Sequence, residues 1–463
     1  MYVMVNHLIK SIFHYLTDKS KRKPSHRDIT WYKRTIKIIG RLNKFFPQPK
    51  FDNWNECDEL ISNAEKVCEQ IIKDNILMTS SADLTYKVAL FKNEKAEYIK
   101  ALQLYLKSLD ISKKLFGKKH SAVGACYNQI GNIYLNLKNF KQAEVYFNKS
   151  SAITNHLVTF DTILDNRNIY YNEETLLAMA MDALEADIMD LFNQAELCNI
   201  KGNPEKALSL YNKALEKAEK HLEKNHPLVA RILNNIAGVY QILNINDQAE
   251  LLFKRVLYIY ELNYGKEHPN IADTLNNLGC HYRLIKRYNE AESFHLQSLE
   301  VGKKVYGDEH PKVAIFQNNL AVDYYFQEQY DKAEYIYIRS LSIMENVFGE
   351  NHPDVAQILN NLALIYERNH DYEKSHKMFI RALNIRDEFF KGINHPDLAQ
   401  SLISLAGSYM VLNKLEEAEP LIIRGIEIME KALGKQHPRS INARETIIVL
   451  QELKNNRQNL ENI

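Results

Sequence analysis

The chain has 463 residues, of which 45% are hydrophobic and 25% are charged, an ordinary composition for a globular protein. Its formal net charge of +1 gives no reason to expect nucleic acid as a general partner, and no apolar run approaches the roughly 18 residues that span a membrane. Glycine and proline are scarce, at 15 and 11 residues, which predicts a mostly helical chain with few tight turns.

The five cysteines are odd in number, far apart in the sequence and never in a C-x-x-C spacing. This pattern favours reduced thiols of a cytoplasmic protein over a disulfide framework or a zinc site. The five are Cys57, Cys68, Cys126, Cys198 and Cys280.

Residues 1–77 are expected to form a helical, basic N-terminal segment. Residues 1–50 contain twelve Lys or Arg and only two acidic residues. The stretch KSKRKPSHR, followed by a Trp and a Tyr, could contact nucleic acid or an anionic membrane through residues 19–34. A solvated helix face and linker is the simpler interpretation of such a stretch.

A 42-residue repeat follows, and we expect about eight units over 78–436. The dipeptide His-Pro returns with spacings of 42, 42, 42, 43 and 42 residues. In each complete unit an Ala or Gly lies eleven residues after the His, a Tyr three residues later, and a small residue nine residues after that. The pairs begin at His226, His268, His310, His352, His395 and His437.

Each unit has the features of two antiparallel helices. Proline at the first helical position lacks an N–H that would be unpaired there, and its φ is already helical. Gly265, three residues before the next His, suits the left-handed cap of a second helix. The small residue and the Tyr put a gap and a ring on one helix face. Because such a pair cannot bury its apolar face alone, we predict an all-α fold, a right-handed α-solenoid of antiparallel helix pairs.

The spacing is interrupted once before the regular array. His120 and His226 are 106 residues apart, about 22 more than two repeats. An insertion, as a loop or an extra helix, is therefore expected near 162–183. After the last repeat, residues 437–463 are expected to form a capping helix and a polar tail, since solenoids need a polar end.

The Ala/Gly-x-x-Tyr spacing resembles the tetratricopeptide repeat. The 42-residue period and stretches such as HPDVAQILNNLALIYERNHDYEKSHKMFIRALNIRDEFF look like its kinesin light chain variety. The resemblance implies a non-catalytic scaffold for protein–protein interaction, with the first helix of each pair lining a concave groove. Residues 1–77 show no sustained heptad pattern, so a motor subunit is not expected.

A second resemblance concerns residues 45–67, FFPQPKFDNWNECDELISNAEKV. This stretch is similar to the segment that precedes such repeats in nucleotide-switch proteins of the apoptotic-ATPase type. No G-x-x-x-x-G-K-[ST] occurs in the chain, so no loop of that kind can cradle a nucleotide phosphate. The resemblance implies an alternative function, a sensor or regulatory arm for such a partner.

Two adjacent asparagines recur in the first helix of four units, although asparagine is a mediocre helix former. By the resemblance, the first of each pair lies on the groove side and the second beside it. Amides donate and accept, so a row of them can pair with the backbone of any extended peptide. The alternative is that the amides bridge adjacent helices and only fix their stacking. The residues are Asn234, Asn235, Asn276, Asn277, Asn318, Asn319, Asn360 and Asn361.

Four more residues are expected in the groove by the same comparison. Arg231, Arg283 and Arg368 could attract an acidic ligand, and Tyr325 could seat an apolar or aromatic side chain. Acidic residues among them dilute the positive charge, so an ordinary mixed-charge surface is the alternative.

The repeated histidines are interpreted as helix-boundary residues. Successive copies are displaced by one repeat, so they cannot converge on one metal ion. The chain also lacks a nucleophile elbow and an H-E-x-x-H motif. We therefore expect no catalytic residue, no metal, no cofactor and no small-molecule substrate, and a protein or peptide as the partner.

Overall fold

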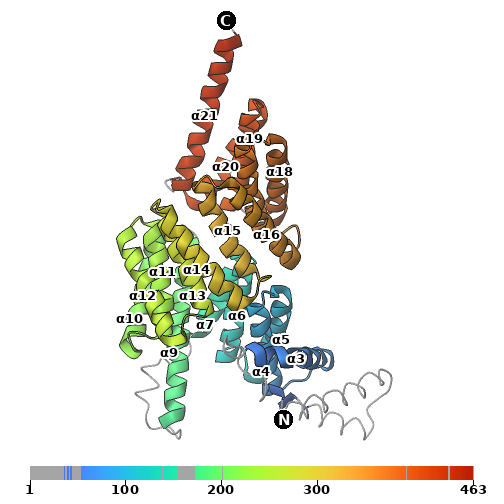
Figure 1. The fold of residues 1–463 in the computed structure, drawn as a ribbon. Coiled ribbons are helices and arrows are strands. Elements are labelled where there is room, and N and C mark those ends of the chain that lie inside the picture. Colours follow the sequence, from blue (N-terminus) through green and yellow to red (C-terminus); the bar gives the residue numbers. More distant parts are fainter. Residues whose placement is uncertain are drawn as a thin grey trace, which may run out of the picture. The chain divides into compact units, whose positions relative to one another are not determined.

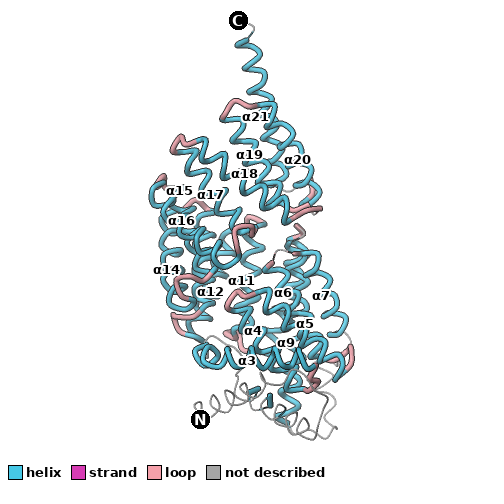
Figure 2. The backbone as a smooth tube through the Cα atoms, turned by 90° about the vertical axis from the view of Figure 1, so that its right-hand side faces the viewer, coloured by secondary structure: helices cyan, strands magenta, loops and turns pink. Residues whose placement is uncertain are grey.

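The computed structural model describes residues 54–461 except 138, 155–172, 201, 393, 436 and 437, together with residues 36, 39, 40, 42 and 43. Every regular element in this part of the chain is an α-helix (Figures 1 and 2). The basic stretch 19–34 lies outside the described residues. None of the described helices is long and apolar enough to cross a membrane. The chain divides into two compact units, 1–193 and 194–463.

In the described residues of the first unit, one helix and two helix pairs are followed by the start of a long helix that continues into the second unit. Its helices are α3 (Trp54–Asp74), α4 (Thr79–Glu94), α5 (Tyr98–Phe116), α6 (Ser121–Asn136), α7 (Phe140–Thr154) and α9 (Glu173–Ile200). Helix α9 runs without a break through 173–183, the second half of the expected insertion. The division at 77 and at 436 predicted from the sequence stays a prediction.

The second unit contains α10, five regular helix pairs and a terminal helix. Its helices are α10 (Pro204–His221), α11 (Pro227–Ile242), α12 (Asn246–Tyr264), α13 (Pro269–Leu284), α14 (Tyr288–Tyr306), α15 (Pro311–Phe326), α16 (Tyr330–Phe348), α17 (Pro353–Arg368), α18 (Tyr372–Phe389), α19 (Pro396–Val411), α20 (Leu415–Leu433) and α21 (Pro438–Glu461).

Histidine caps the first helix of each regular pair. The ring Nδ1 accepts a hydrogen bond from the backbone N–H two residues later, as His268 does from Asn270 at 3.2 Å. Proline occupies the first helical turn, as predicted. In four of these caps the ring also stacks on an aromatic residue of the preceding helix end, with centroids 3.9 to 4.6 Å apart. The interpretation as helix-boundary residues is confirmed for the caps in the described residues.

Positive φ angles end the helices in two ways. Gly265 and three counterparts have φ of 74° to 89°, as predicted, but their ψ is extended, a conformation open mainly to glycine. The turn inside each regular pair contains a non-glycine residue with φ of 55° to 62°, such as Lys286 and Glu328. The sequence pattern did not predict this second position, because those side chains share no common chemistry.

Neighbouring helix pairs share their buried side chains. Ala237 and Phe253 of one pair pack in a single apolar cluster with Leu278, Tyr282 and Ala291 of the next. Phe253 is 1% exposed, and burial of such a side chain contributes about 2–3 kcal/mol. Clusters of the same kind join α15 to α18, and α19 to α21. The pairs therefore stack to bury their apolar faces, and the predicted all-α solenoid is confirmed.

Candidate functional site

The four asparagine pairs lie at equivalent places on α11, α13, α15 and α17, the first helices of four successive pairs. Seven of the eight side chains are partly buried. The exception is Asn360, which is 5% exposed. One recurrent sequence position thus becomes a row of amides that crosses four repeats.

These amides form a ladder of hydrogen bonds between repeats. In each rung, the Nδ2 of the second asparagine donates to the Oδ1 of the first asparagine in the preceding pair. The rungs are Asn277 to Asn234 at 2.9 Å, Asn319 to Asn276 at 2.8 Å, and Asn361 to Asn318 at 2.9 Å. Asn277, Asn319 and Asn361 therefore bridge adjacent helices, and this explains why they are tolerated inside helices.

The ladder ends differently at its two ends. At the start, Asn235 donates to the backbone oxygen of Arg231 in its own helix, at 3.1 Å. At the far end, Asn360 donates to the hydroxyl of Ser401 in α19 at 3.1 Å, and this hydroxyl also accepts from Arg386 at 2.8 Å. The Oδ1 of Asn360 is buried and has no partner among the described residues. Asn360 is thus a buried link, unlike the other leading asparagines.

Each remaining leading asparagine keeps a free amide donor. Asn234, Asn276 and Asn318 accept a rung through Oδ1, and their Nδ2 groups donate to no other described residue. Their side chains are partly exposed. The rung fixes the plane of each amide and leaves its N–H bonds available to a ligand.

Arg283 is already paired within the protein. Its Nη1 donates to the backbone oxygen of Asn319 at 3.0 Å and to Oδ1 of Asp323 at 3.2 Å. The side chain is 18% exposed, and the Asp323 carboxylate is fully buried. Because a buried carboxylate balances its charge, Arg283 attracts an acidic ligand less strongly than we expected from the sequence.

Arg368 and Tyr325 form an exposed pair between α17 and α15. The Nε of Arg368 donates to the Tyr325 hydroxyl at 3.1 Å, and the guanidinium lies 5.9 Å from the ring centroid. Phe326 beside them is 48% exposed and stacks on Tyr288, with centroids 5.3 Å apart. Arg231 is exposed on α11, three residues before Asn234. The structure thus brings Tyr325 and Arg368 together in an aromatic patch.

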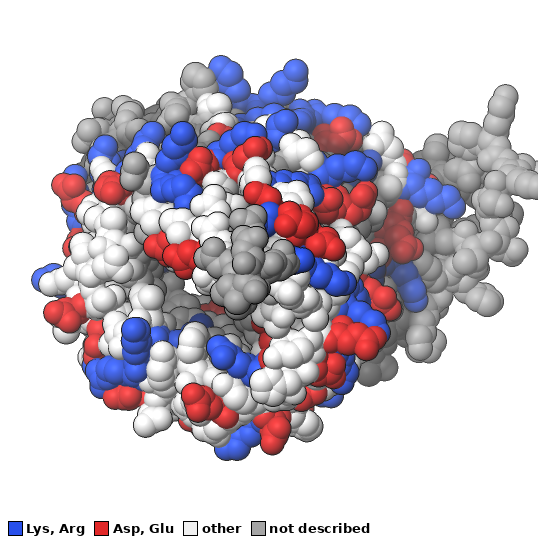
Figure 3. Space-filling model, turned by 90° about the horizontal axis from the view of Figure 1, so that it is seen from above, with Lys and Arg blue, Asp and Glu red and all other residues white. Residues whose placement is uncertain are grey.

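Surface charge along the repeats is mixed. Lys312 and Asp273, from adjacent first helices, form an exposed ion pair of 3.0 Å. On the face seen in Figure 3, basic and acidic side chains of the described residues are interspersed. A surface of this kind does not select strongly for an acidic ligand.

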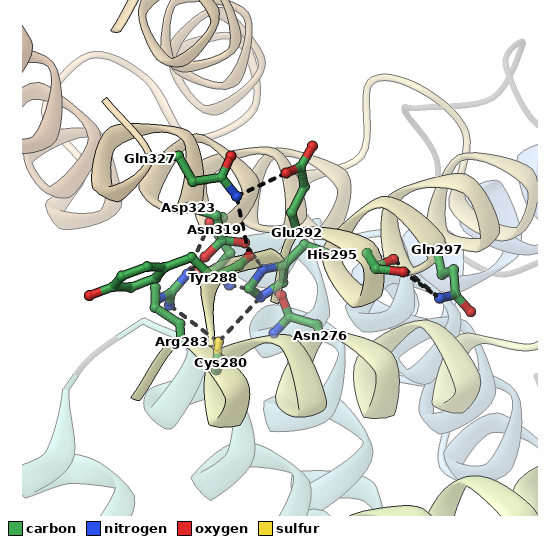
Figure 4. A network of polar contacts seen from close by, with 11 residues as sticks. Asn276, Cys280, Arg283, Tyr288, Glu292, His295, Gln297, Asn319, Asp323 and Gln327 are labelled. Atoms are coloured by element: carbon green, nitrogen blue, oxygen red, sulfur yellow. Dashed lines mark hydrogen bonds and ion pairs between the residues drawn. The ribbon is translucent and has the colours of Figure 1, made fainter. Parts of the chain in front are cut away.

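A buried polar network lies between α13, α14 and α15 (Figure 4). The Nε2 of His295 is 3.6 Å from the sulfur of Cys280, and its Nδ1 is hydrogen-bonded to Oδ2 of Asp323. The Nη2 of Arg283 is 3.4 Å from the same sulfur. His295 and Asp323 are fully buried, whereas Cys280 is partly exposed.

Sequence reasoning missed this network, although the repeat itself carries the signal. Forty-two residues away from His295 on either side are Phe253 and Tyr337. The positions equivalent to Asp323 are Val239, His281, Ile365 and Ser408. The His295 position is aromatic in both neighbouring repeats, so the imidazole could have identified the site. The Asp323 position is polar at His281 and Ser408 as well and gives a weaker signal.

All five cysteines are free thiols, three of them buried. In the described part of the chain, no group of three or more His, Cys, Asp and Glu side chains could hold a metal ion.

Family models for the tetratricopeptide repeat match most of the chain. One matches residues 80–155, 187–261, 246–304, 281–337 and 312–388, and a second matches residues 398–439. Among curated proteins, none matches the sequence. No comparison supports the likeness of residues 45–67 to the linker of apoptotic-ATPase-type proteins.

Solved structures with a similar fold include BtubC (BKLC) from P. vanneervenii, at 25% identity and a TM-score of 0.43, over 51% of this chain and 94% of that one. The nearly identical TPR-like repeats of a putative kinesin light chain from Podosopora anserina match at 23% identity and a TM-score of 0.37, over 44% of this chain and 97% of that one. A Rap protein complexed with competence and sporulation factor matches at 14% identity and a TM-score of 0.45, over 92% of this chain and 98% of that one.

Proposed function

The chain belongs to the tetratricopeptide repeat family, and on that premise we propose that it is a non-catalytic scaffold that binds an extended segment of a partner protein. The segment lies along the first helices α11, α13 and α15 and is held through its backbone. The ligand is a peptide of another protein and not a small-molecule substrate.

The observation that carries this proposal is the free amide donor in each rung. Asn234, Asn276 and Asn318 present one Nδ2 group per repeat, partly exposed and without an acceptor among the described residues. An extended peptide offers backbone carbonyls at regular intervals. Each hydrogen bond to such a carbonyl contributes about 0.5–1.5 kcal/mol net.

The ladder also lowers the cost of binding. An asparagine that swings freely loses rotamer entropy when it binds, whereas these amides are already fixed by their rungs. Only the ligand then has to be ordered, so we expect a Kd of about micromolar.

Side-chain selectivity comes from the aromatic patch beside the ladder. Phe326 is 48% exposed, and Tyr325 lies under the guanidinium of Arg368. An apolar or aromatic ligand side chain can pack there, as interface anchors commonly do. The mixed charge of the surface gives no preference for a strongly acidic segment.

The test uses a peptide selected from a random library on the immobilised full chain. Changing Asn234, Asn276 and Asn318 together to Asp keeps the Oδ1 acceptor of every rung but replaces each free donor with a carboxylate oxygen. Loss of three hydrogen bonds of about 1 kcal/mol each weakens the selected peptide by about a hundredfold. Titration calorimetry measures the Kd.

The matched control is Asn277→Ala with Asn319→Ala, which deletes two rungs and leaves the leading donors. We expect a loss of less than about tenfold, because only pre-ordering is affected. A triple Asp variant that keeps the wild-type circular dichroism and binds the peptide as tightly as wild type would contradict the proposal.

A further inference from the structure

The network at the α13–α15 junction is not explained by repeat stacking. At the equivalent places in the next junction, Tyr337 and Ile365 fill the space with apolar contacts. His295 and Asp323 are instead fully buried polar groups. Burying such groups costs free energy unless they are paired, and an apolar pair usually serves stability as well or better.

The backbone of Gly279 lies close to the imidazole. Gly279 stands where the neighbouring repeats have alanine, and a Cβ there would lie 2.5 Å from the His295 ring. Three positions therefore differ from the two adjacent repeats at one junction: a glycine, an imidazole and a carboxylate. The glycine alone is not specific for an imidazole, because Gly131 approaches the Phe147 ring as closely. A coordinated change of this kind indicates a use for the group.

The order of the three groups is that of an activated thiol. Asp323 accepts the hydrogen bond of Nδ1, which orients the ring and leaves Nε2 facing the Cys280 sulfur. An imidazole held in this way can take the thiol proton and then stabilise the thiolate as an ion pair.

The electrostatics agree with this order. Burial alone would raise the pKa of the Cys280 thiol, but the hydrogen bond to His295 and the charge of Arg283 outweigh it, so the pKa lies below its ordinary value. Burial opposes protonation of His295, yet its hydrogen bonds to Asp323 and Cys280 raise its pKa. From α16, Tyr337 also faces Asp323 and Arg283, and burial raises its pKa, so it stays neutral.

We propose that Cys280 is a nucleophilic thiol, activated by His295 and Asp323, that forms a mixed disulfide with small disulfide molecules. The Cys280 sulfur attacks one sulfur of the small disulfide, a new S–S bond forms and the original S–S bond breaks. The leaving thiolate takes the proton that His295 had accepted, so the products are the modified protein and one small thiol.

The Cys280 residue keeps part of its surface open to solvent, although its sulfur is enclosed by His295 and Arg283. Cys280 is partly exposed and lies one helical turn after Asn276 on α13, with Arg283 on the same side. A modified Cys280 therefore carries its new group beside the ladder. This modification site does not depend on the proposed peptide binding.

The test measures the reaction of the full chain with dithiodipyridine, a small aromatic disulfide that releases an absorbing thione. Cys280→Ser identifies the phase that belongs to this residue. Cys198, the other partly exposed cysteine, is the internal comparison. Peptide mapping by mass spectrometry assigns each modified thiol.

We expect Cys280 to react at least about tenfold faster than Cys198 at about pH 6, since a lowered pKa keeps a larger fraction of the Cys280 thiol ionised in acid. The rate falls as the pH drops below the lowered pKa of Cys280. His295→Phe, which installs the residue found at Phe253, removes the fast phase and restores the ordinary alkaline pH profile. A Cys280 no faster than Cys198, or a fast phase that survives His295→Phe, would overturn the proposal.

If His295→Phe does not fold, a second variant provides the test. Asp323→Asn keeps the size of the side chain and removes the carboxylate that orients the imidazole. A folded Asp323→Asn protein is expected to show its Cys280 pH profile shifted to higher pH. An unchanged profile in this variant also overturns the proposal.

Discussion

Two neighbouring junctions of the second unit solve the same packing problem with different residues. At the α15–α17 junction, Tyr337 and Ile365 share one apolar cluster with Ala321. At the α13–α15 junction, His295 occupies the place of that tyrosine and is hydrogen-bonded to Asp323. The helices stack in both cases, so the repeat tolerates the polar triad of Cys280, His295 and Asp323, in which every member is paired. The difference teaches that stacking needs the volume at these positions and not their apolar character.

The largest effect is expected from breaking the triad at one residue. Asp323→Val puts in the residue found at Val239 and leaves His295 and Arg283 without their carboxylate. Loss of one partner of a buried charged group costs about 3–5 kcal/mol. Hydrogen exchange of α13 to α15 measures the local stability, which suits a repeat protein that need not unfold in one step.

Ile365→Val is the control at the equivalent position of the other junction, with an expected cost of about 1 kcal/mol. Equal costs for the two substitutions would mean that the carboxylate adds nothing to the junction.

Replacing His295 and Asp323 together, with Gly279 filled, should reverse the loss. The combination Gly279→Ala, His295→Phe and Asp323→Val takes its first two residues from Ala237 and Phe253 of the α11–α13 junction and its third from Val239 of α11. Well-packed apolar replacements of buried ionic groups are neutral or stabilising by about 1–4 kcal/mol. We expect the triple variant to match or exceed wild type in hydrogen-exchange protection while it loses the fast thiol reaction. A triple variant as unstable as Asp323→Val would show that the junction needs its polar residues.

A smaller effect is expected at His281, next to the triad in sequence. Its ring is fully buried, both ring nitrogens lack a hydrogen-bond partner among the described residues, and Nε2 is 4.0 Å from Glu250. Burial lowers the pKa of this imidazole. His281→Val copies Val239 and should raise the free energy of unfolding by about 1–2 kcal/mol, because a buried unsatisfied group is removed.

The gain should depend on pH. Below the ordinary histidine pKa of about 6.5, the unfolded chain binds a proton that the folded chain resists, so wild-type stability falls as the pH drops from there towards the lowered pKa. His281→Val removes this loss, and its advantage in thermal unfolding is larger at about pH 5 than at about pH 8. An advantage that shrinks in acid would contradict the assignment.

The sequence predicted the repeat and the starts and ends of its helices because those depend on local chemistry. The His-Pro pairs mark helix starts, and Gly265 and its counterparts mark helix ends, through the backbone angles that these residue types allow. The sequence locates the asparagine pairs, but it does not predict their hydrogen-bond partners. Asn277 meets Asn234 across 43 residues, a contact that exists only after the helix pairs stack.

The triad was missed for the same reason. Cys280, His295 and Asp323 come from three helices, and no spacing along the chain brings them together. A position-by-position comparison of the repeats would have singled out His295, but only the stacked structure shows that it faces Asp323 and Cys280.

The central claim, that the ladder offers its free donors to a peptide backbone, is tested most directly by the structure of the full chain with the selected peptide bound. The account predicts that the Nδ2 groups of Asn234, Asn276 and Asn318 each lie about 3 Å from a backbone oxygen of the peptide, with every rung intact. A peptide that binds away from these amides, or one that contacts them through side chains alone, would contradict it.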